Sequence, residues 1–566
     1  MTVGIVGGGP AAAAVETALG DIDAETGRRN ASTLEQLELA VVVGRTGEGV
    51  FEQVNEQVLN TEMGWIAVEL GGLGGVPVVD AAVAGFGPET GCYACLTGRV
   101  SANLDETPGE RAPEIPAHVA RFVGAVAGRE VVRVLEGKLE IFGRAVEIPH
   151  AKRQFLPLPN CTCDRSRDPA IRRGHTERTV EESIARAERA LDDRLGIVQE
   201  VGEAESFPVP YYLARSCDTT GFSDVSAARD AAGVALDWNG AFMKALGEAL
   251  ERYCAGVYRT ANFETGTPSQ VEGAVPPSAF VCQSTPKGEA IEWVPGENLS
   301  TGENVMVPAE FVYFPPPSRR YRSPVTTGLG LGNGGAGALL SGLYEVIERD
   351  ATMLSWYSTF EPLGLAVEDE RFETLVARAR SENLTVSPLL LTQDVDVPVV
   401  AVAVRGESWP RLALGSDADL DVTRAARSAL AEALQNWMEL RGMGENEADG
   451  ALGEIGRYAS EPTPAVEFVE PETTIPAESV GPSEPPAGEN ELAAVLDRVE
   501  RAGLDAYAVR TTTRDVETLG FEAVRVLIPS AQPLCFGEIY FGERARTVPD
   551  TLGFTPELGR AHHPFP

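Results

Sequence analysis

Two segments of the chain repeat one arrangement of charged side chains in an apolar setting. Residues 245–253 read Ala-Leu-Gly-Glu-Ala-Leu-Glu-Arg-Tyr, and residues 342–350 read Gly-Leu-Tyr-Glu-Val-Ile-Glu-Arg-Asp. Each segment has two glutamates spaced i and i+3 and an arginine directly after them: Glu248, Glu251 and Arg252 in the first, Glu345, Glu348 and Arg349 in the second. On a helix, this spacing places both carboxylates on one face with the arginine close to it.

Carboxylates in apolar surroundings need a counter-charge. Mg²⁺ is a natural one, because it binds carboxylate oxygens together with the phosphates of a nucleotide. Arg252 and Arg349 would then contact phosphate oxygens or brace the carboxylates. The alternative is two amphipathic helices with ordinary surface Glu–Arg pairs, each worth only a few tenths of a kcal/mol. The matching apolar flanks of the two segments favour a site for a metal and a nucleotide.

A glycine-rich segment precedes the second pair of glutamates. Residues 326–337 read Thr-Thr-Gly-Leu-Gly-Leu-Gly-Asn-Gly-Gly-Ala-Gly. A loop of this kind that leads into a helix can bring backbone amides against phosphate groups. The segment lacks the GxxxxGK[ST] pattern of a Walker loop, and simple loop flexibility is the alternative explanation.

Four of the eight cysteines form two close pairs. Cys92 and Cys95 have Cys-x-x-Cys spacing, Cys161 and Cys163 have Cys-x-Cys spacing, and turn-forming Gly or Pro residues flank both pairs. Four thiolates can close a tetrahedral, structural zinc site, and this is the prediction for these residues. The alternative is a chance pairing of buried cysteines, since Cys-x-Cys is the less common spacing.

The composition is that of a globular protein with an acidic surface. The 566 residues include 47 Lys+Arg and 84 Asp+Glu, which gives a formal net charge of −37. Such a surface repels phosphates and argues against nucleic-acid binding. Adaptation to a salty cytoplasm explains the charge better than basic partners do. The sequence has no long apolar run and no cationic segment at its start of the kind found in signal peptides. We therefore expect a cytoplasmic protein that does not enter the membrane.

The first part of the chain contains the elements expected to carry the cysteines. Residues 1–25 read as a strand, a glycine turn and a helix, in which Gly7, Gly9 and Ala12 match the dinucleotide-type pattern GxGxxA. Residues 21–29 are polar and show no strand that could carry the acidic ribose partner of that pattern, which argues against nucleotide binding here. With apolar strands at 37–44 and 65–75, residues 1–165 are predicted to form a Rossmann-like partial domain with the zinc site.

The remaining residues are predicted to form a linker and a second domain. Residues 166–195 are rich in charge at helical spacing and are expected to form a connecting helix. Residues 196–566 then form the domain in which both glutamate segments lie. Within it, residues 461–489 are rich in Pro, Glu and Ser and are expected to be a disordered insertion. The predicted fold class is α/β (α+β).

Taken together, these motifs resemble the YcaO family. The paired Glu-x-x-Glu-Arg helices, with Asn333 in the loop before the second, are similar to its ATP site. Residues 428–435, Ser-Ala-Leu-Ala-Glu-Ala-Leu-Gln, resemble the family's third helix, and the terminal His-Pro-Phe-Pro resembles the proline-rich end of azoline-forming members. The cysteine segments, with His150, resemble the zinc-bearing region of cyclodehydratases that mature ribosomal peptides, as in the biosynthesis of microcin-like bacteriocins.

The resemblance implies that residues 196–566 are a YcaO-type ATP-binding domain that activates backbone amides of a ribosomally made peptide. Such enzymes join a Cys, Ser or Thr side chain to the preceding carbonyl and phosphorylate the resulting oxygen, and loss of phosphate leaves an azoline. It implies Mg²⁺ on Glu248, Glu251, Glu345 and Glu348, and structural Zn²⁺ on Cys92, Cys95, Cys161 and Cys163. It also implies contacts to ATP from Asn333, Arg252, Arg349, Glu432 and Arg427, and a catalytic C-terminus at Pro564 and Pro566.

The expected partner is a precursor peptide. Because the N-terminal region is short for a fused ubiquitin-activating-like domain, a separate leader-binding or ubiquitin-activating-like partner protein is also implied, and a homodimer stays open. The sequence departs from the family pattern where Gly337 replaces a frequent glutamate, where Lys244 replaces a serine, and where no lysine matches near Gly233. Two alternatives to azoline formation therefore stay open: thioamide formation with external sulfide, or a degenerate, non-catalytic scaffold that binds a peptide.

Overall fold

The computed structural model describes residues 2–566 with the exception of 23, 33, 35–36, 60, 105–113, 150, 164–167 and 449–453. His150 and the domain boundary predicted at residue 165 lie outside the described residues. Among the helices that the structure describes, none combines the length and the apolar character needed to cross a membrane. Helices and strands mix throughout the chain, which confirms the predicted α/β class.

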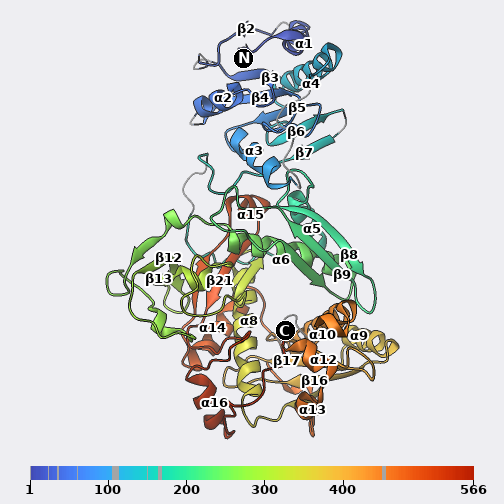
Figure 1. Ribbon diagram of the computed structural model, residues 1–566, viewed down its shortest axis with the longest axis vertical. Coiled ribbons are helices and arrows are strands. Elements are labelled where there is room, and N and C mark those ends of the chain that lie inside the picture. Colours follow the sequence, from blue (N-terminus) through green and yellow to red (C-terminus); the bar gives the residue numbers. More distant parts are fainter. Residues whose placement is uncertain are drawn as a thin grey trace.

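The N-terminal part forms a seven-stranded mixed sheet between two layers of helices, at one end of the molecule (Figure 1). The strand order is β2 (Thr26–Arg28), β1 (Val3–Val6), β3 (Leu39–Arg45), β4 (Gly64–Leu70), β5 (Ala81–Phe86), β6 (Arg144–Ile148) and β7 (Ala151–Gln154). The first four strands are parallel and the last three pairings are antiparallel. One face packs on α1 (Gly9–Gly20) and α4 (Ala117–Leu135), the other on α2 (Val50–Val58) and α3 (Tyr93–Ala102).

The strand, glycine turn and helix predicted at the start of the chain are confirmed as β1 and α1. Gly7 has a φ of +96°, and a Cβ there would lie 2.0 Å from the carbonyl oxygen of Val43, so only glycine fits. The expectation that residues 21–29 contain no strand is wrong, because β2 pairs in parallel with β1. This three-residue edge strand is too short and polar to show a periodic pattern. Its Arg28 donates a hydrogen bond to the carbonyl of Gly7, where the dinucleotide pattern would have an acidic side chain.

Two other predicted segments differ from expectation. In the linker, the helix is limited to α5 (Val180–Ala187), which starts at a capping box formed by Thr179 and Glu182, and one 3₁₀ turn, η1 (Glu188–Ala190). Residues 168–179 instead run along the second part of the chain (residues 198–566), where the amide of Ala336 donates to the carbonyl of Gly174.

The segment 461–489, expected to be disordered, contains α13 (Thr463–Val469), β19 (Thr474–Pro476) and η4 (Ala477–Ser479). Buried Phe468 and Val469 explain this order, because they anchor α13 in the core.

In the rest of the chain, as far as its residues are described, the strands form three sheets. The first is antiparallel and contains β8 (Val198–Glu205), β9 (Tyr211–Ser216) and β10 (Asp230–Val234). The second contains β11 (Glu264–Gly266), β12 (Ile291–Asn298), β20 (Tyr507–Arg510), β21 (Glu522–Leu527) and β14 (Leu329–Gly332), with β13 (Asn304–Pro308) paired to β12. The third contains β18 (Leu412–Ala418), β17 (Val399–Arg405), β16 (Thr385–Leu390), β15 (Leu363–Ala366) and β19.

Three long helices pack on these sheets and carry the predicted site residues. Helix α6 (Trp238–Gly256) packs on β9 and β10, α8 (Gly335–Trp356) on β14 and β21, and α10 (Val422–Met443) on β17 and β18. These three helices confirm the helical segments that the sequence predicts at 245–253, 342–350 and 428–435. The remaining helices lie around this framework: α7 (Ala309–Val312), α9 (Glu370–Ser381), α11 (Glu445–Ala448), α12 (Ile455–Ser460), α14 (Glu489–Arg501), α15 (Arg514–Leu519), α16 (Arg544–Leu552), η2 (Thr260–Asn262) and η3 (Pro277–Ala279).

Candidate functional site

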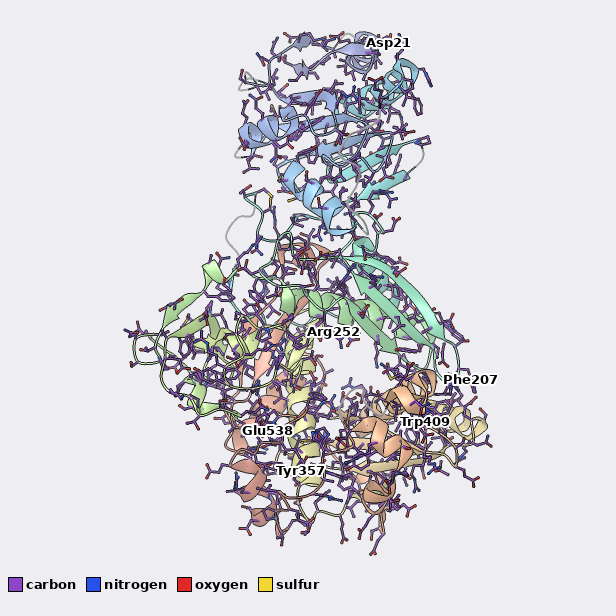
Figure 2. The ribbon with its side chains drawn as sticks, viewed as in Figure 1. Asp21, Phe207, Arg252, Tyr357, Trp409 and Glu538 are labelled. Atoms are coloured by element: carbon purple, nitrogen blue, oxygen red, sulfur yellow. The ribbon has the colours of Figure 1, made fainter. Side chains whose placement is uncertain are left out.

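The four predicted metal-binding glutamates line one cavity of about 390 Å³, which we call the carboxylate cavity. Helix α6 contributes Glu248 and Glu251, and α8 contributes Glu345 and Glu348. Arg252, which follows them on α6, lines the same cavity, and Figure 2 shows it near the middle of the lower part of the molecule. Strand β18 and the loop after it add two carboxylates and α10 adds one more: Asp417, Asp419 and Glu432.

Backbone and hydroxyl donors hold four of these carboxylates in place. Glu248 accepts a hydrogen bond of 2.6 Å from the amide of Ala232, and Glu345 accepts one of 2.9 Å from the amide of Gly328 in the glycine-rich segment. Ser416 on β18 connects the other two: its hydroxyl donates to Glu348 at 2.6 Å, and its amide donates to Glu432 at 2.7 Å. The fixed carboxylate oxygens form a preorganised set of hard donors.

Burial works against the ionised form of these groups. It raises the pKa of Glu251 to about 8, with the Glu345 carboxylate acting in the same direction. Burial also raises the pKa of Glu348 to about 7, although the nearby Arg349 opposes the shift. Burial raises the pKa values of Glu248, Asp417 and Glu432 as well. A divalent cation would relieve this repulsion, so the donor set fits Mg²⁺, which prefers carboxylate oxygens.

Two arginines offset part of the negative charge. Arg252 forms an ion pair with Glu248 and donates to the carbonyl of Asp230 at 2.7 Å. Arg349 lies 3.4 Å from Glu348 and 3.9 Å from Glu432. Both residues therefore brace carboxylates, which is one of the two roles that their spacing predicted.

A second cavity of about 590 Å³, which we call the apolar cavity, adjoins the first. The two cavities share Ala232, Lys244, Glu248 and Glu251. The apolar cavity is also lined by Val180, Met243, Leu331 and Phe521. Asn333 lies in its wall, where its amide group donates to the hydroxyl of Ser183 on α5 at 2.9 Å.

The C-terminal segment docks beside the carboxylate cavity. The carbonyl of Pro566 accepts a hydrogen bond of 3.2 Å from Arg349, and the chain end lies between α8 and α10 in Figure 1. Upstream, Trp356 donates to the carbonyl of Ala561 at 2.8 Å, and buried His563 donates from Nε2 to the carbonyl of Cys535 at 2.9 Å. These contacts bring Pro566 to the predicted site, with Pro564 buried two residues before it.

The structure separates one predicted residue from the others and adds three. Arg427 lines neither cavity among the described residues, and its guanidinium lies 3.6 Å from Asp369. The additions are Asp417, Asp419 and Lys244, which line the carboxylate cavity. Arg525 lines neither cavity among the described residues, but its charge favours the ionised form of Glu251. Arg525 on β21 donates to the carbonyls of Val325 and Thr326, and burial lowers its pKa to about 9, with Arg322 acting in the same direction. The single charged residue of the strand β18 was the signal that could have revealed Asp417.

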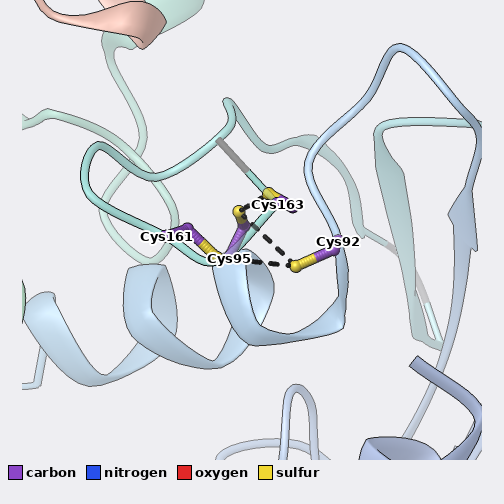
Figure 3. A group of neighbouring side chains, drawn as sticks. All are labelled: Cys92, Cys95, Cys161 and Cys163. Carbon is purple, nitrogen blue, oxygen red and sulfur yellow. Dashed lines mark hydrogen bonds between the residues drawn. The ribbon is translucent and has the colours of Figure 1, made fainter. Parts of the chain in front are cut away.

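The four predicted zinc ligands also come together (Figure 3). Cys92 occupies the position directly before α3 and Cys95 lies in the first turn of this helix, while Cys161 and Cys163 lie in the segment after β7. Their sulfur atoms all lie within 4.8 Å of one another, with separations of 3.6 Å for Cys92–Cys161 and 3.4 Å for Cys95–Cys163. Ligands of a tetrahedral zinc ion are about 3.8 Å apart, so these residues fit a structural Zn²⁺. Contact with Cys161 lowers the pKa of Cys163, and the guanidinium of Arg514 acts in the same direction.

Comparisons with known proteins agree with this geometry. An uncharacterized protein of Methanothermobacter thermautotrophicus is 31% identical over 325 residues, which cover 54% of this chain and 82% of that protein. A solved structure of a heterocyclase in complex with substrate and cofactor has a TM-score of 0.74 at 19% identity and covers 98% of this chain and 83% of its own. The structure of the heterocyclase TruD has a TM-score of 0.66 at 18% identity, with 98% and 82% covered. At these identities, the two structures show a shared fold.

The family assignment comes from the protein-family comparison. Residues 232–532 match the family described as YcaO cyclodehydratase, ATP- and Mg²⁺-binding. This region includes α6, α8 and α10 and the glutamates of the carboxylate cavity. Because the match spans more than half of the 566 residues, the chain belongs to the YcaO family.

Proposed function

We propose that this protein is an ATP-dependent cyclodehydratase that forms azolines from Cys, Ser or Thr residues of a ribosomally made peptide. The observation that carries the proposal is the convergence of paired glutamates from α6 and α8 on one cavity, beside the docked C-terminus. The family description as ATP- and Mg²⁺-binding supports it, and so does the fold shared with heterocyclases.

In this proposal, the phosphates of ATP occupy the carboxylate cavity and the base occupies the apolar cavity. Glu248, Glu251, Glu345 and Glu348 would hold Mg²⁺, which neutralises phosphate charge when bound. Glu432 lies with these carboxylates rather than in the apolar cavity, so we assign it to the metal and phosphate end of the site. Asn333, in the wall of the apolar cavity, would meet the ribose or the base.

The chemistry is that of phosphoryl transfer to an amide oxygen. Addition of the Cys, Ser or Thr side chain to the preceding carbonyl carbon gives a hemiorthoamide. Its oxygen takes the γ-phosphoryl group of ATP, and ADP is released. Loss of phosphate and of the amide proton then forms the C=N bond of the ring. We assign Pro564 and Pro566 a catalytic role in these steps, because Arg349 holds Pro566 beside the carboxylate cavity.

The rest of the chain would support this reaction. We assign residues 196–566 to the catalytic domain, residues 166–195 to the linker, and residues 1–165 to an N-terminal domain stabilised by Zn²⁺ on the four cysteines. The N-terminal domain would present a precursor peptide, either alone or with a separate leader-binding partner.

The direct test is peptide-dependent ATP consumption. Purified protein with Mg²⁺, ATP and peptides rich in Cys, Ser or Thr should release phosphate, and mass spectrometry should show the loss of one water per ring. Glu345→Ala should abolish both signals, whereas Glu407→Ala, at an exposed residue, should leave them unchanged. If no peptide stimulates phosphate release and Glu345→Ala has no effect, the assignment as an enzyme is wrong. The alternative function, a scaffold that binds a peptide, would then be favoured. Sulfur incorporation that requires added sulfide would instead indicate thioamide formation.

A further inference from the structure

The charges that line the carboxylate cavity are strongly unequal. Seven carboxylates face three cations, as the lining residues show: Glu248, Glu251, Glu345, Glu348, Asp417, Asp419 and Glu432 against Lys244, Arg252 and Arg349. Mg²⁺ offsets part of this excess, but a triphosphate brings several negative charges of its own. The cavity therefore needs a cation that is available to the phosphates.

Two of the three cations are already engaged by the protein. Arg252 pairs with Glu248 and donates to the carbonyl of Asp230. Arg349 lies against Glu348 and Glu432 and holds the carbonyl of Pro566. These contacts hold both guanidinium groups against the wall of the carboxylate cavity.

Lys244 differs from both arginines. It lies on α6, one turn before Glu248, and its side chain is exposed. Within the described part of the chain, no carboxylate lies within 4.0 Å of its ammonium group. Its charge still reaches across the cavity, where it favours the ionised forms of Asp417 and Glu432. Lys244 also lines both cavities, so it stands at the passage between them.

From this position we propose that Lys244 binds the phosphate chain of the nucleotide where it passes from the apolar cavity to the carboxylate cavity. The inference rests on the proposed nucleotide site. A lysine ammonium is a compact point charge on a flexible stem, which suits a phosphate group that arrives with the ligand. Binding of a nucleotide would give Lys244 the close ionic partner that the protein itself does not provide.

The test compares the binding of Mg–ATP and of adenosine, measured by isothermal titration calorimetry. Lys244→Gln should weaken Mg–ATP binding by at least about tenfold, which corresponds to about 1.4 kcal/mol. It should leave adenosine binding unchanged, because adenosine has no phosphate. Lys244→Arg should keep most of the affinity for Mg–ATP, and the control Lys152→Gln, at an exposed lysine of β7, should behave like the unchanged protein. The salt dependence of Mg–ATP binding should also be smaller for Lys244→Gln.

Three outcomes would overturn the inference. If Lys244→Gln binds Mg–ATP as tightly as the unchanged protein while Glu345→Ala loses binding, the nucleotide site stands and the role of Lys244 is wrong. Equal weakening of Mg–ATP and adenosine would show that Lys244 only shapes the cavity. If the unchanged protein binds no Mg–ATP, the proposed function fails together with the inference.

Discussion

Glu348 is a buried carboxylate, and its proposed role as a metal ligand would offset the cost of its burial. Its side chain is only 5% exposed, and it accepts a hydrogen bond from Ser416 while Glu432 lies nearby as a second negative charge. A buried carboxylate of this kind is costly to ionise unless a cation compensates it. The metal-free protein therefore holds Glu348 in an unfavourable state at neutral and alkaline pH, and the bound metal and nucleotide would remove that cost.

The substitution Glu348→Gln tests this trade through its pH dependence. The pKa of Glu348 is raised from 4.5 in the unfolded chain to about 7 in the folded protein. The protonated carboxyl group therefore stabilises the folded protein fully below pH 4.5, and this stabilisation is lost as the pH rises through 7. At pH 8, Glu348→Gln should thus raise the urea midpoint of the metal-free protein and increase its free energy of unfolding by up to about 3 kcal/mol. At pH 4.5, the substitution should have little effect on either quantity. It should also weaken Mg–ATP binding.

The exposed Glu407→Gln is the matched control and should change neither property. A midpoint for Glu348→Gln that stays below that of the unchanged protein at pH 8 would contradict this account.

At the scale of elements, glycines set how closely the helices approach the sheets. A Cβ at Gly233 on β10 would lie 2.2 Å from the amide nitrogen of Ala245 on α6, and a Cβ at Gly330 on β14 would lie 2.2 Å from the carbonyl oxygen of Ala338 on α8. These close approaches fix α6 and α8 against their strands, and thereby fix the distance between the two pairs of glutamates. The glycine-rich segment thus has a packing role in addition to its backbone donor at Gly328.

Two alanine substitutions in this segment should have opposite effects. Gly330→Ala must push α8 away from β14, so it should destabilise the protein by about 1–3 kcal/mol and reduce ATP consumption. Gly337→Ala meets nothing closer than 3.7 Å and lies in the first turn of α8, so it should be neutral or stabilising by up to about 1 kcal/mol. Thermal unfolding of both variants measures the difference, and equal losses would show that the close packing at Gly330 is unimportant.

At the scale of the whole molecule, the cysteine cluster lies where the N-terminal sheet meets the second part. Arg514 on α15 donates to the sulfur of Cys163 at 3.2 Å. Beside it, Arg99 on α3 forms a fully buried ion pair with Asp515, and Tyr253 on α6 donates to the same carboxylate at 2.7 Å. Since α6 also carries Glu248 and Glu251, a continuous set of contacts connects the cysteine cluster with the carboxylate cavity.

Removal of the expected zinc should therefore also loosen elements outside the N-terminal part. Purified protein should contain about one zinc per chain, and less than about half would contradict a closed structural site. Chelation, or Cys95→Ser, should lower the midpoint of thermal unfolding and increase hydrogen exchange in α3 and α15, because the ligands lose the ion that holds them together. Cys282→Ser, at a cysteine outside the cluster, is the control and should change neither the zinc content nor the exchange.

The sequence predicted the features that depend on local spacing. Helix periodicity placed the glutamates of α6 and α8 on single faces, and apolar runs identified β1, β3 and β4, because these patterns arise between residues close together in the chain. Short or irregular elements could not be predicted from periodicity or apolar runs. The polar strand β2 has too few residues to show a period, and α13 is a single short helix among prolines.

The sequence by itself thus determined which residues form pairs and which chemistry their types suit. Only the tertiary structure decided that both pairs face one cavity, that Asp417 and Lys244 join them, that Arg427 does not, and that the C-terminus reaches Arg349. The cysteine pairs likewise meet across separations of 69 residues for Cys92–Cys161 and 68 residues for Cys95–Cys163. The physical reason is that these contacts form between distant segments, which are brought together by the burial of apolar helix and sheet faces, and no local pattern encodes which segments those are.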